Sequence, residues 1–310
     1  MIAQTDTWPE LRYDAYSDTR DTLHMYSQII GKIRLALTPP LAQWAHSPLL
    51  LAQDGFTTTP LWVGDGTMAA GLDLIRHEAR FERSDGRRVA LKLGAPVADF
   101  YSDARAAFDE LGVAVTINAV PQEIPEPIPF DQDTTHHVYD PEQANRLWQA
   151  MIRVGSVYEQ YASGYWGKQT PPSFYWGGGD FGTTRYSGRP AMAPIGLPKI
   201  MTGSLDAEAA TAELTFGNDA VPMPAFLAMA FPPPPGIESA TVQPAAAKWA
   251  QAPGMPGGFM LPYDAVRTAE DPRGTLLSFL TSTYEAVADR GGWDRELLEQ
   301  RPPQLIRQAA

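Results

Sequence analysis

Residues 47–93 read SPLLLAQDGFTTTPLWVGDGTMAAGLDLIRHEARFERSDGRRVALKL, and this stretch decides the fold class. It contains three Asp-Gly pairs, at positions 54–55, 65–66 and 85–86. Both residues of such a pair tolerate a positive φ, so Asp-Gly between apolar or alternating runs is typical of β-hairpin turns. Within residues 77–83, residue types that proteins usually bury alternate with charged residues. This alternation predicts a strand with one face against the core and the other face in solvent. The stretch therefore predicts an antiparallel meander, with strands at residues 47–53, 56–63, 67–75, 77–83 and 87–93.

Helices are predicted on both sides of this meander. From Asp18 to Leu37, apolar side chains recur at steps of three and four, as a helix that buries one face requires. Pro39 and Pro40 end that helix. Residues 97–111 repeat the pattern, and residues 113–117 add a short predicted strand.

The second half of the chain follows a proline-rich, acidic connector at residues 118–139. A helix begins at Asp140, whose carboxylate can cap the free amides, with Pro141 at the first helical position. The remaining predicted elements are extended runs at 225–231 and 259–263, a helix from Asp271 to Gly291, and an amphipathic tail at 295–306.

A weak internal repeat relates the two halves. Each contains Gly-Lys, Pro-Pro and Trp in the same order, and the tryptophan follows the second proline by four residues in both, at Pro40 to Trp44 and Pro172 to Trp176. Chance similarity between proline-rich turns is the alternative. We predict an α+β protein of two tandem, weakly repeated halves, each an antiparallel meander sheet flanked by helices, packed about a pseudo-twofold axis. Its predicted segments are 1–117, the connector 118–139, 140–294 and the tail 295–310.

Charge and composition limit the classes of molecule that the protein is expected to bind. The chain has 24 basic and 36 acidic side chains, a net charge of -12, which repels phosphate backbones and disfavours nucleic acid or anionic membranes as partners. No segment approaches the length of an apolar membrane span, and the N-terminal residues do not read as a signal peptide. The absence of cysteine excludes disulfides. We expect a cytoplasmic protein, and its oligomeric state stays open.

A polar stripe on the first predicted helix holds an acid, an imidazole, an amide and an amine: Asp21, His24, Gln28 and Lys32. Such a stripe can position a substrate or move a proton, because histidine titrates near neutrality and an adjacent carboxylate can fix its tautomer. The alternative is an ordinary solvated helix face.

Residues 161–188 hold eight aromatic residues and seven glycines. Rigid rings on a backbone that can approach closely suit stacking against a planar or sugar ligand. Lys168, Asp180 and Arg185 could fix its polar groups, and Trp44, Trp166 and Trp176 could form apolar walls. The alternative is that these rings fill the core.

The sequence offers no motif for a metal, a nucleophile or a phosphate loop. His136 and His137 are adjacent, so on an extended chain they point to opposite faces. There is no H-E-x-x-H, no thiol and no G-x-S-x-G, and Gly177–Gly179 is followed by Asp180 in place of Lys-Ser/Thr. We expect no metal site and leave the cofactor open.

Several motifs run along the chain: Trp8-Pro9-Glu10-Leu11, Thr22-Leu23-His24, Gln28-Ile29-Ile30-Gly31-Lys32-Ile33-Arg34, Pro127-Ile128-Pro129-Phe130-Asp131, Thr135-His136, Tyr139-Asp140-Pro141, Leu261-Pro262-Tyr263, Ala265-Val266-Arg267, Ser282-Thr283-Tyr284-Glu285 and Trp293-Asp294. In these motifs the chain resembles a bacterial family known only as domain of unknown function 5996. The likeness spans nearly the whole chain and brings no established activity, substrate or cofactor. It implies that six polar residues stand at family motif positions: His24, Gln28, Lys32, Arg34, His46 and His136.

The chain departs from the family pattern at two places. Members often read Pro-Val-His-Phe-Phe-Trp-Gly where this chain has Pro171-Pro172-Ser173-Phe174-Tyr175-Trp176-Gly177, and a His-Glu pair where it has Ala207-Glu208. Serine neither binds metal comparably nor acts as a base near pH 7. The departures leave open a divergent member of a metal-dependent family that has lost its ligands.

Taken together, these features predict a cytoplasmic small-molecule-binding protein, and a cofactor-independent enzyme with His24 as general acid/base. Lys32 and His136 complete the predicted catalytic set. The predicted substrate-binding residues are Gln28, Arg34, Trp44, His46, Trp166, Lys168, Trp176, Asp180 and Arg185. The alternative of a different class is a ligand- or partner-binding protein without chemistry.

Overall fold

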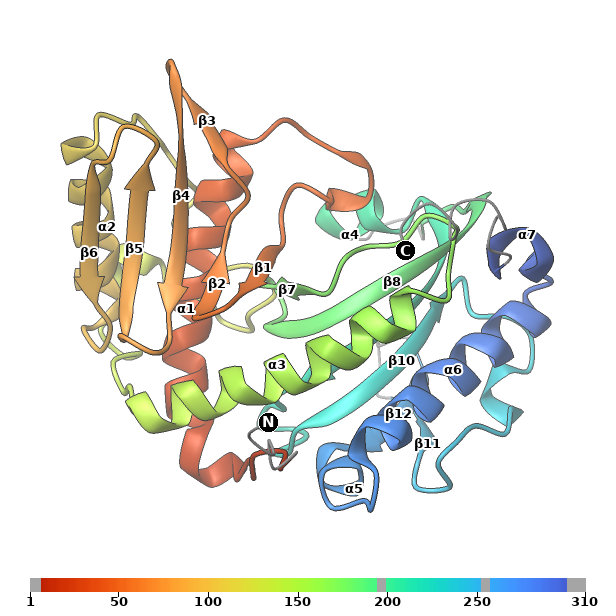
Figure 1. Cartoon of the computed structure of the whole chain (residues 1–310). Helices are drawn as coiled ribbons and strands as arrows, with labels where there is room; N and C mark the ends of the chain where they lie inside the picture. The colour runs from red at the N-terminus through yellow and green to blue at the C-terminus, as the bar shows by residue number, and fades with distance from the viewer. Residues whose placement is uncertain (1–6, 194–198, 252–256, 300–310) are drawn as a thin grey trace, which may run out of the picture. The chain divides into compact units, whose positions relative to one another are not determined.

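The computed structural model describes residues 7–193, 199–251 and 257–299, and it is drawn in Figure 1. The chain divides into two compact units. The first comprises the described residues up to Val154, with Pro172–Phe181 and Leu214–Pro224. The second comprises Gly155–Pro171, Gly182–Glu213 and the described residues from Ala225 onward. Helices flank antiparallel strands, so the predicted α+β class is confirmed.

The strands of the first unit form an antiparallel sheet in the order β7-β1-β2-β4-β5-β6, and β3 pairs with β4. These strands are β1 (Leu49–Ala52), β2 (Gly55–Thr57), β3 (Leu61–Val63), β4 (Gly66–Asp73), β5 (Glu78–Arg83), β6 (Arg88–Lys92) and β7 (Ser173–Tyr175). On β5, Ala79 and Phe81 are fully buried, as the alternation predicts. The meander read from residues 47–93 is therefore confirmed.

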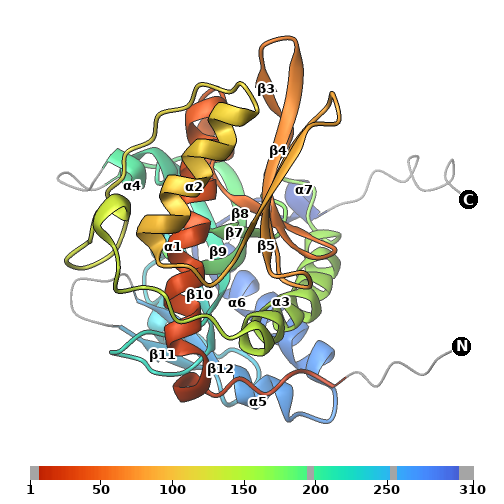
Figure 2. The same cartoon turned by 90° about the vertical axis from the view of Figure 1, so that its left-hand side faces the viewer.

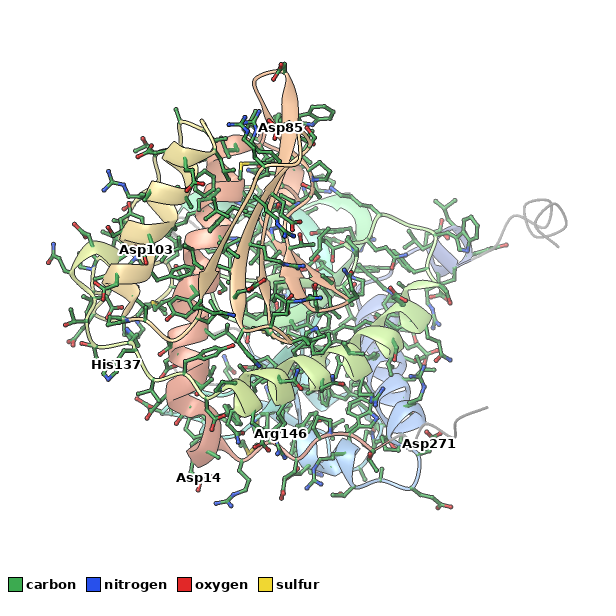
Figure 3. All side chains as sticks on the ribbon, turned by 60° about the vertical axis from the view of Figure 1, so that its left-hand side comes forward. Asp14, Asp85, Asp103, His137, Arg146 and Asp271 are labelled. Carbon is green, nitrogen blue, oxygen red and sulfur yellow. The ribbon has the colours of Figure 1, made fainter. Side chains whose placement is uncertain are left out.

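All three Asp-Gly pairs lie at strand connections. They join β1 to β2, β3 to β4 and β5 to β6, and Asp85 stands exposed at the last of these turns (Figure 3). Position 55 has no room for a side chain, because a Cβ there would lie 1.9 Å from the Leu72 carbonyl oxygen. The strand predicted at 56–63 is instead two strands, β2 and β3, since Pro60 between them has no N–H to donate to a ladder.

The helical elements of the first unit are α1 (Tyr13–Leu37), the 3-10 turns η1 (Ala42–Trp44) and η2 (Phe130–Gln132), α2 (Val97–Glu110), and the larger part of α3 (Pro141–Ala162). Figure 2 shows α2 alongside α1, where the rings of Tyr26 and Phe100 lie 4.2 Å apart. Asp140 caps α3 as predicted, since its Oδ1 accepts from the Glu142 amide at 2.8 Å. The strand predicted at residues 113–117 is wrong: these residues are irregular and line a cavity against α1 and α2.

The first helix begins five residues earlier than predicted, at Tyr13. A hydrogen bond to a distant segment holds this additional turn: the Tyr16 hydroxyl donates to the Phe216 carbonyl oxygen at 2.8 Å. That partner lies 200 residues away in the sequence. The spacing of apolar residues within the helix contains no information about such a distant contact, so it could not predict the earlier start.

The strands of the second unit follow the order β11-β12-β10-β9-β8. They are β8 (Asp180–Pro190), β9 (Ala207–Thr215), β10 (Ala225–Phe231), β11 (Lys248–Ala250) and β12 (Gly258–Pro262), and the helical elements are α4 (Lys199–Ser204), η3 (Ile237–Ser239), α5 (Tyr263–Arg267), α6 (Pro272–Arg290) and α7 (Arg295–Glu299). The predicted run 225–231 coincides with β10, and Asp271 caps α6 by accepting from the Gly274 amide at 2.9 Å. Residues 300–306 of the predicted tail lie outside the described residues. The segment boundaries, the repeat and its pseudo-twofold axis stay predictions.

Candidate functional site

The polar stripe of α1 is held against two other segments of the first unit. His24 contacts the backbone of residues 176–177, and Lys32 contacts the backbone at Val120. Gln28 lies between them and contacts both segments. The stripe is therefore not an ordinary solvated helix face: it is packed, and it fixes two loops from distant parts of the sequence.

The hydrogen bonds of His24 define its tautomer. Its Nε2 lies 2.8 Å from the Trp176 carbonyl oxygen and 3.1 Å from that of Gly177, and carbonyl oxygens only accept, so Nε2 carries the proton. The Nδ1 atom is then an unprotonated acceptor. Burial is the largest influence on this ring and lowers the pKa of His24, which favours the neutral form at pH 7.

Gln28 and Lys32 hold residues 118–123 in place. The Gln28 amide is satisfied at both ends by one residue, with Nε2 donating to the Gln122 carbonyl oxygen at 2.8 Å and Oε1 accepting from the Gln122 amide at 2.8 Å. Lys32 Nζ donates to the Val120 carbonyl oxygen at 2.6 Å and lies 5.7 Å from the Phe130 ring centroid. Burial lowers the pKa of Lys32 to about 8. These contacts fix the backbone that leads into Glu123.

Two carboxylates, Glu123 and Asp180, approach the same glycine turn as His24. Burial raises the pKa of Asp180 to about 7; a hydrogen bond from Thr215 opposes this shift and the charge of Glu123 adds to it. Desolvation by the surrounding protein atoms also raises the pKa of Glu123, although this residue is exposed. Two neighbouring carboxyl groups with raised pKa values share protons, so the pair retains a proton close to neutrality.

The glycine turn at Gly177–Gly179 brings these groups together. A Cβ at Gly177 would lie 2.5 Å from Glu123 Oε1, and one at Gly178 would lie 2.7 Å from Asp180 Oδ2. At Gly179, where φ is +80°, a Cβ would lie 3.3 Å from His24 Nδ1. Each glycine thus leaves room for one ionisable group. We name His24, Glu123 and Asp180 the acid–base cluster.

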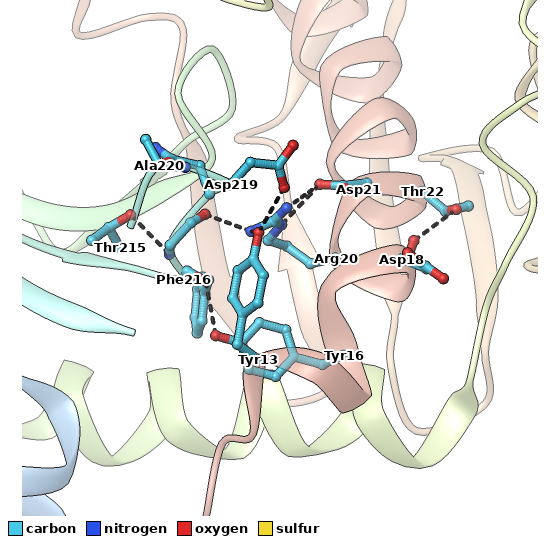
Figure 4. A network of polar contacts seen from close by, with 12 residues as sticks. Tyr13, Tyr16, Asp18, Arg20, Asp21, Thr22, Thr215, Phe216, Asp219 and Ala220 are labelled. Carbon is cyan, nitrogen blue, oxygen red and sulfur yellow. Dashed lines mark hydrogen bonds and ion pairs between the residues drawn. The ribbon is translucent and has the colours of Figure 1, made fainter. Parts of the chain in front are cut away.

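A network of polar contacts attaches Thr215, the partner of Asp180, to the start of α1 (Figure 4). Arg20 donates to the Gly217 carbonyl oxygen at 2.5 Å and forms an ion pair with Asp21 at 2.6 Å. The Gly217 amide in turn donates to the Thr215 hydroxyl at 3.2 Å. Through these bonds α1 positions both His24 and the residue that hydrogen bonds to Asp180.

Trp176 supports this arrangement from the core. Its ring is buried, its Nε1 donates to the Ser47 carbonyl oxygen at 2.7 Å, and it lies directly on Gly31 of α1. The side chain is thus fixed by protein groups, while its carbonyl oxygen accepts from His24.

We expect Gly31→Ala to lower the free energy of unfolding by about 1–2 kcal/mol. The new Cβ would lie 2.3 Å from the Trp176 ring, and the overpacking cost of roughly 1–3 kcal/mol exceeds the gain in helix propensity. Urea denaturation measures the difference. Gly164→Ala is the control, since its Cβ would meet nothing nearer than 3.7 Å. Equal stability of the two variants would contradict the packing.

The other predicted residues of the first unit lie in two further places. His136 Nδ1 lies 2.7 Å from Oδ2 of the fully buried Asp133, which also accepts from the backbone amides of Thr135 and His136. His137 is exposed (Figure 3). Arg34, Trp44 and His46 gather where the chain turns back at the end of α1. Neither group forms a hydrogen bond or ion pair with the acid–base cluster within the described ranges.

In the second unit, Arg185 is enclosed by three tyrosines. Its guanidinium carbon lies 3.4 Å from the ring centroid of Tyr161, 4.4 Å from that of Tyr284 and 4.9 Å from that of Tyr165. Cation–π contacts of this kind stabilise a buried arginine. Lys168 lies over the ring of Tyr186 at 5.1 Å, and the Trp166 side chain is 44% exposed. Trp166, Lys168 and Arg185 thus belong to the second unit, whereas the acid–base cluster belongs to the first.

Sequence reasoning missed Glu123, Thr215 and Asp133. Glu123 stands in a segment read only as a connector, and its φ of +57° is a conformation that non-glycine residues seldom adopt. The strongest available signal was the glycine triplet, because close backbone approach is a common reason for consecutive glycines.

The first unit also holds a cavity of about 310 Å³ between α1, α2 and residues 113–117. Most of its lining residues are apolar, such as Ile29, Ile33 and Phe108, and Arg105 and Asp109 also line it. None of the predicted site residues lines it. The cavity is large enough for a small apolar molecule.

Within the described ranges, no three His, Cys, Asp or Glu side chains are grouped so as to hold a metal ion. Among the helices of the described residues, none has the length and apolarity needed to cross a membrane.

Comparison with known proteins gives one family. The model of a family of unknown function, DUF5996, matches residues 8–300. Searches of curated proteins and of solved structures return no significant match.

Proposed function

We propose that this chain, which belongs to the DUF5996 family of unknown function, binds a small molecule in its first unit and transfers a proton to or from it through His24, Glu123 and Asp180. The observation that carries the proposal is the convergence of these three groups on the turn at Gly177–Gly179. Glu123 is an exposed residue, and His24 and Asp180 are half-buried residues.

The cluster supplies an acid and a base at one glycine turn. A general acid works best when its pKa lies near the working pH, and burial raises the pKa of Asp180 to about 7. The unprotonated Nδ1 of His24 is a base on the other side of the same turn. In the proposed reaction, Nδ1 removes a proton from the substrate while the carboxyl pair delivers one. Neither step needs a cofactor.

Lys32 and Gln28 act as positioning residues in this proposal. Their hydrogen-bonding groups are engaged by the backbone at Val120 and Gln122, two residues that precede Glu123. They set where the Glu123 carboxylate lies and do not themselves touch the substrate. The proposal further includes a bacterial, cytoplasmic setting, which the lack of cysteine and the net charge of -12 support.

Proton transfer can be tested before the substrate is known. The purified protein is incubated in D2O with pools of metabolites, and proton NMR follows signals lost to deuterium exchange and signals of new products. We expect the wild type to act on one pool and Asp180→Asn to be at least about 100-fold slower, the usual contribution of a general acid. His24→Gln should be similarly slow, because the amide lacks a basic nitrogen.

The control is Asp103→Asn, which removes one negative charge from an exposed position of α2 (Figure 3). It should leave the rate unchanged. A wild type that leaves every pool unchanged, or an Asp180→Asn protein as fast as the wild type, would refute the proposed chemistry.

A second candidate function, ligand binding without chemistry, is favoured by the 310 Å³ cavity. In that case the same pools would show binding by saturation-transfer NMR with no exchange. Ala104→Phe, which fills the cavity, would abolish the binding while Asp180→Asn would not. This result would also fit a divergent member whose chemistry has been lost.

A further inference from the structure

An arginine at the end of α1 is buried and has no ion-pair partner among the described residues. The Arg34 side chain belongs to a residue that is only 4% exposed, and its Nε and Nη1 atoms are buried without a hydrogen-bond partner in the described part of the chain. Burial alone lowers its pKa to about 10, and no carboxylate contributes to that shift. Because a buried, unpaired cation is costly, a protein retains one chiefly where something else completes it.

Two further donors belong to this region: His46 lies near the guanidinium, and Trp44 stacks on His46. His46 is 5% exposed, and the charge of Arg34 is one of the influences that lower its pKa. Its Nδ1 accepts from the Leu41 amide at 3.0 Å, so the proton of the neutral ring sits on Nε2. Trp44 stacks on His46 with ring centroids 5.4 Å apart, and its indole Nε1 is also buried without a partner in the described residues.

The loop that carries these donors is held in an unusual conformation. Gln43 and Trp44 have φ values of +50° and +55°, in the left-handed region that costs a non-glycine residue about 1 kcal/mol or more. The loop is fixed to α1, since the Thr38 hydroxyl donates to the Arg34 carbonyl oxygen at 2.6 Å. On its other side, the Ser47 amide donates to the Trp44 carbonyl oxygen at 2.8 Å. Strain of this kind persists where the surroundings impose it, and it is common in ligand-binding loops.

We propose that Arg34, Trp44 and His46 bind an oxyanion, the phosphate or carboxylate group of a small molecule. All three present N–H donors, and the unpaired donors are the two of Arg34 and the one of Trp44. Arginine suits such groups because its planar fork matches their oxygen atoms. The site is distinct from the acid–base cluster and does not depend on the chemistry proposed there, since Arg34 follows His24 by ten residues, about 15 Å of helical rise.

The test measures thermal stability and binding of inorganic phosphate and of acetate, in buffers adjusted to equal ionic strength with sodium chloride. A specific anion should raise the melting temperature of the wild type and give a saturable calorimetric isotherm, because a ligand that binds only the folded state stabilises it. Phosphate acting alone would identify a phosphate site, and acetate acting alone a carboxylate site.

Three variants separate a built site from a general salt effect. Arg34→Gln should lose the response to both anions, yet melt no lower than the wild type in chloride, because it removes an unpaired buried charge. Trp44→Phe keeps the ring without the N–H and should bind at least about 5-fold more weakly, the loss expected for one hydrogen bond to a charged group. Arg88→Gln, at an exposed position of β6, is the charge-matched control and should bind as the wild type does.

Two results would overturn the proposal. One is a wild type that responds to neither phosphate nor acetate beyond the effect of chloride. The other is an Arg34→Gln protein that responds as strongly as the wild type. Both readouts are independent of the deuterium-exchange assay, so failure of this site and failure of the acid–base chemistry are distinguishable.

Discussion

Replacing Asp180 with asparagine is expected to stabilise the protein at pH 8 by about 2–4 kcal/mol, while slowing the proposed reaction. Asparagine has nearly the shape of aspartate and can still accept the hydrogen bond from Thr215, but it carries no charge. The wild-type carboxyl must ionise where burial and the charge of Glu123 disfavour ionisation, and these raise its pKa to about 7. One pKa unit corresponds to about 1.36 kcal/mol, which sets the scale.

The pH dependence follows from the direction of this shift. The unfolded carboxyl has a pKa of 3.8, so between about pH 4 and pH 7 the folded state binds more protons than the unfolded state. The free energy of unfolding contributed by Asp180 therefore falls as pH rises through this window. It is fully present below pH 4 and absent above pH 7. The asparagine variant lacks this dependence, so the two proteins should converge near pH 4.

Urea denaturation at pH 4.5, 6 and 8 measures the effect. Asp103→Asn is the control, since it removes an equal charge from an exposed position of α2 and should change stability by less than about 0.5 kcal/mol. An Asp180→Asn protein no more stable than the wild type at pH 8 would mean that Asp180 ionises normally. The acid–base proposal would then lose its acid.

Replacing Asp54 with alanine is expected to destabilise the protein by about 3 kcal/mol. Asp54 is 5% exposed, and its two oxygens accept from Arg80 Nη1 at 2.7 Å and Nη2 at 2.9 Å. Removing one partner of a buried ion pair leaves the other charge uncompensated, at a cost of roughly 3–5 kcal/mol. We expect a cost at the lower end of this range, because the Arg80 side chain is 22% exposed and its Nη1 keeps a second carboxylate, Asp73 Oδ2, at 3.8 Å.

The matched control is Asp14→Ala, which breaks the ion pair between Asp14 and Arg12 (Figure 3). Those side chains are 70% and 66% exposed, and an exposed pair contributes at most about 1 kcal/mol. Urea midpoints of the two variants test the difference. If Asp54→Ala were as stable as Asp14→Ala, the Asp54–Arg80 pair would not be the link that the geometry indicates between the β1–β2 turn and β5.

The fold could be predicted from the sequence wherever neighbouring residues determine the backbone conformation. Asp-Gly at 65–66 and 85–86 marks hairpin turns because both residues tolerate positive φ, and Asp140-Pro141 starts a helix because a carboxylate caps free amides. Residues 113–117 were misread as a strand for the same reason. Their apolar alternation satisfies the local rule, but in the fold these side chains line a cavity against α1 and α2.

Only part of the candidate site could be predicted from the sequence. His24, Gln28 and Lys32 were found because helical spacing places them on one face. Glu123 was not, because nothing within the connector indicates that Gln122 is bonded to Gln28, 94 residues earlier. Asp180 was selected as a ligand-binding residue of an aromatic segment, and its high pKa follows from burial and Glu123, both of which are properties of the folded chain.

The sequence by itself determined the α+β class, the hairpins of the meander and the polar stripe of α1, because each depends on residues a few positions apart. The tertiary structure decided which groups meet that stripe. It brought His24, Glu123 and Asp180 to one glycine turn. It also left Arg34 buried near His46, with no ion-pair partner in the part of the chain that the structure describes. The physical reason is that burial and charge pairing, which set pKa values and unsatisfied donors, exist only after segments distant in sequence have packed together.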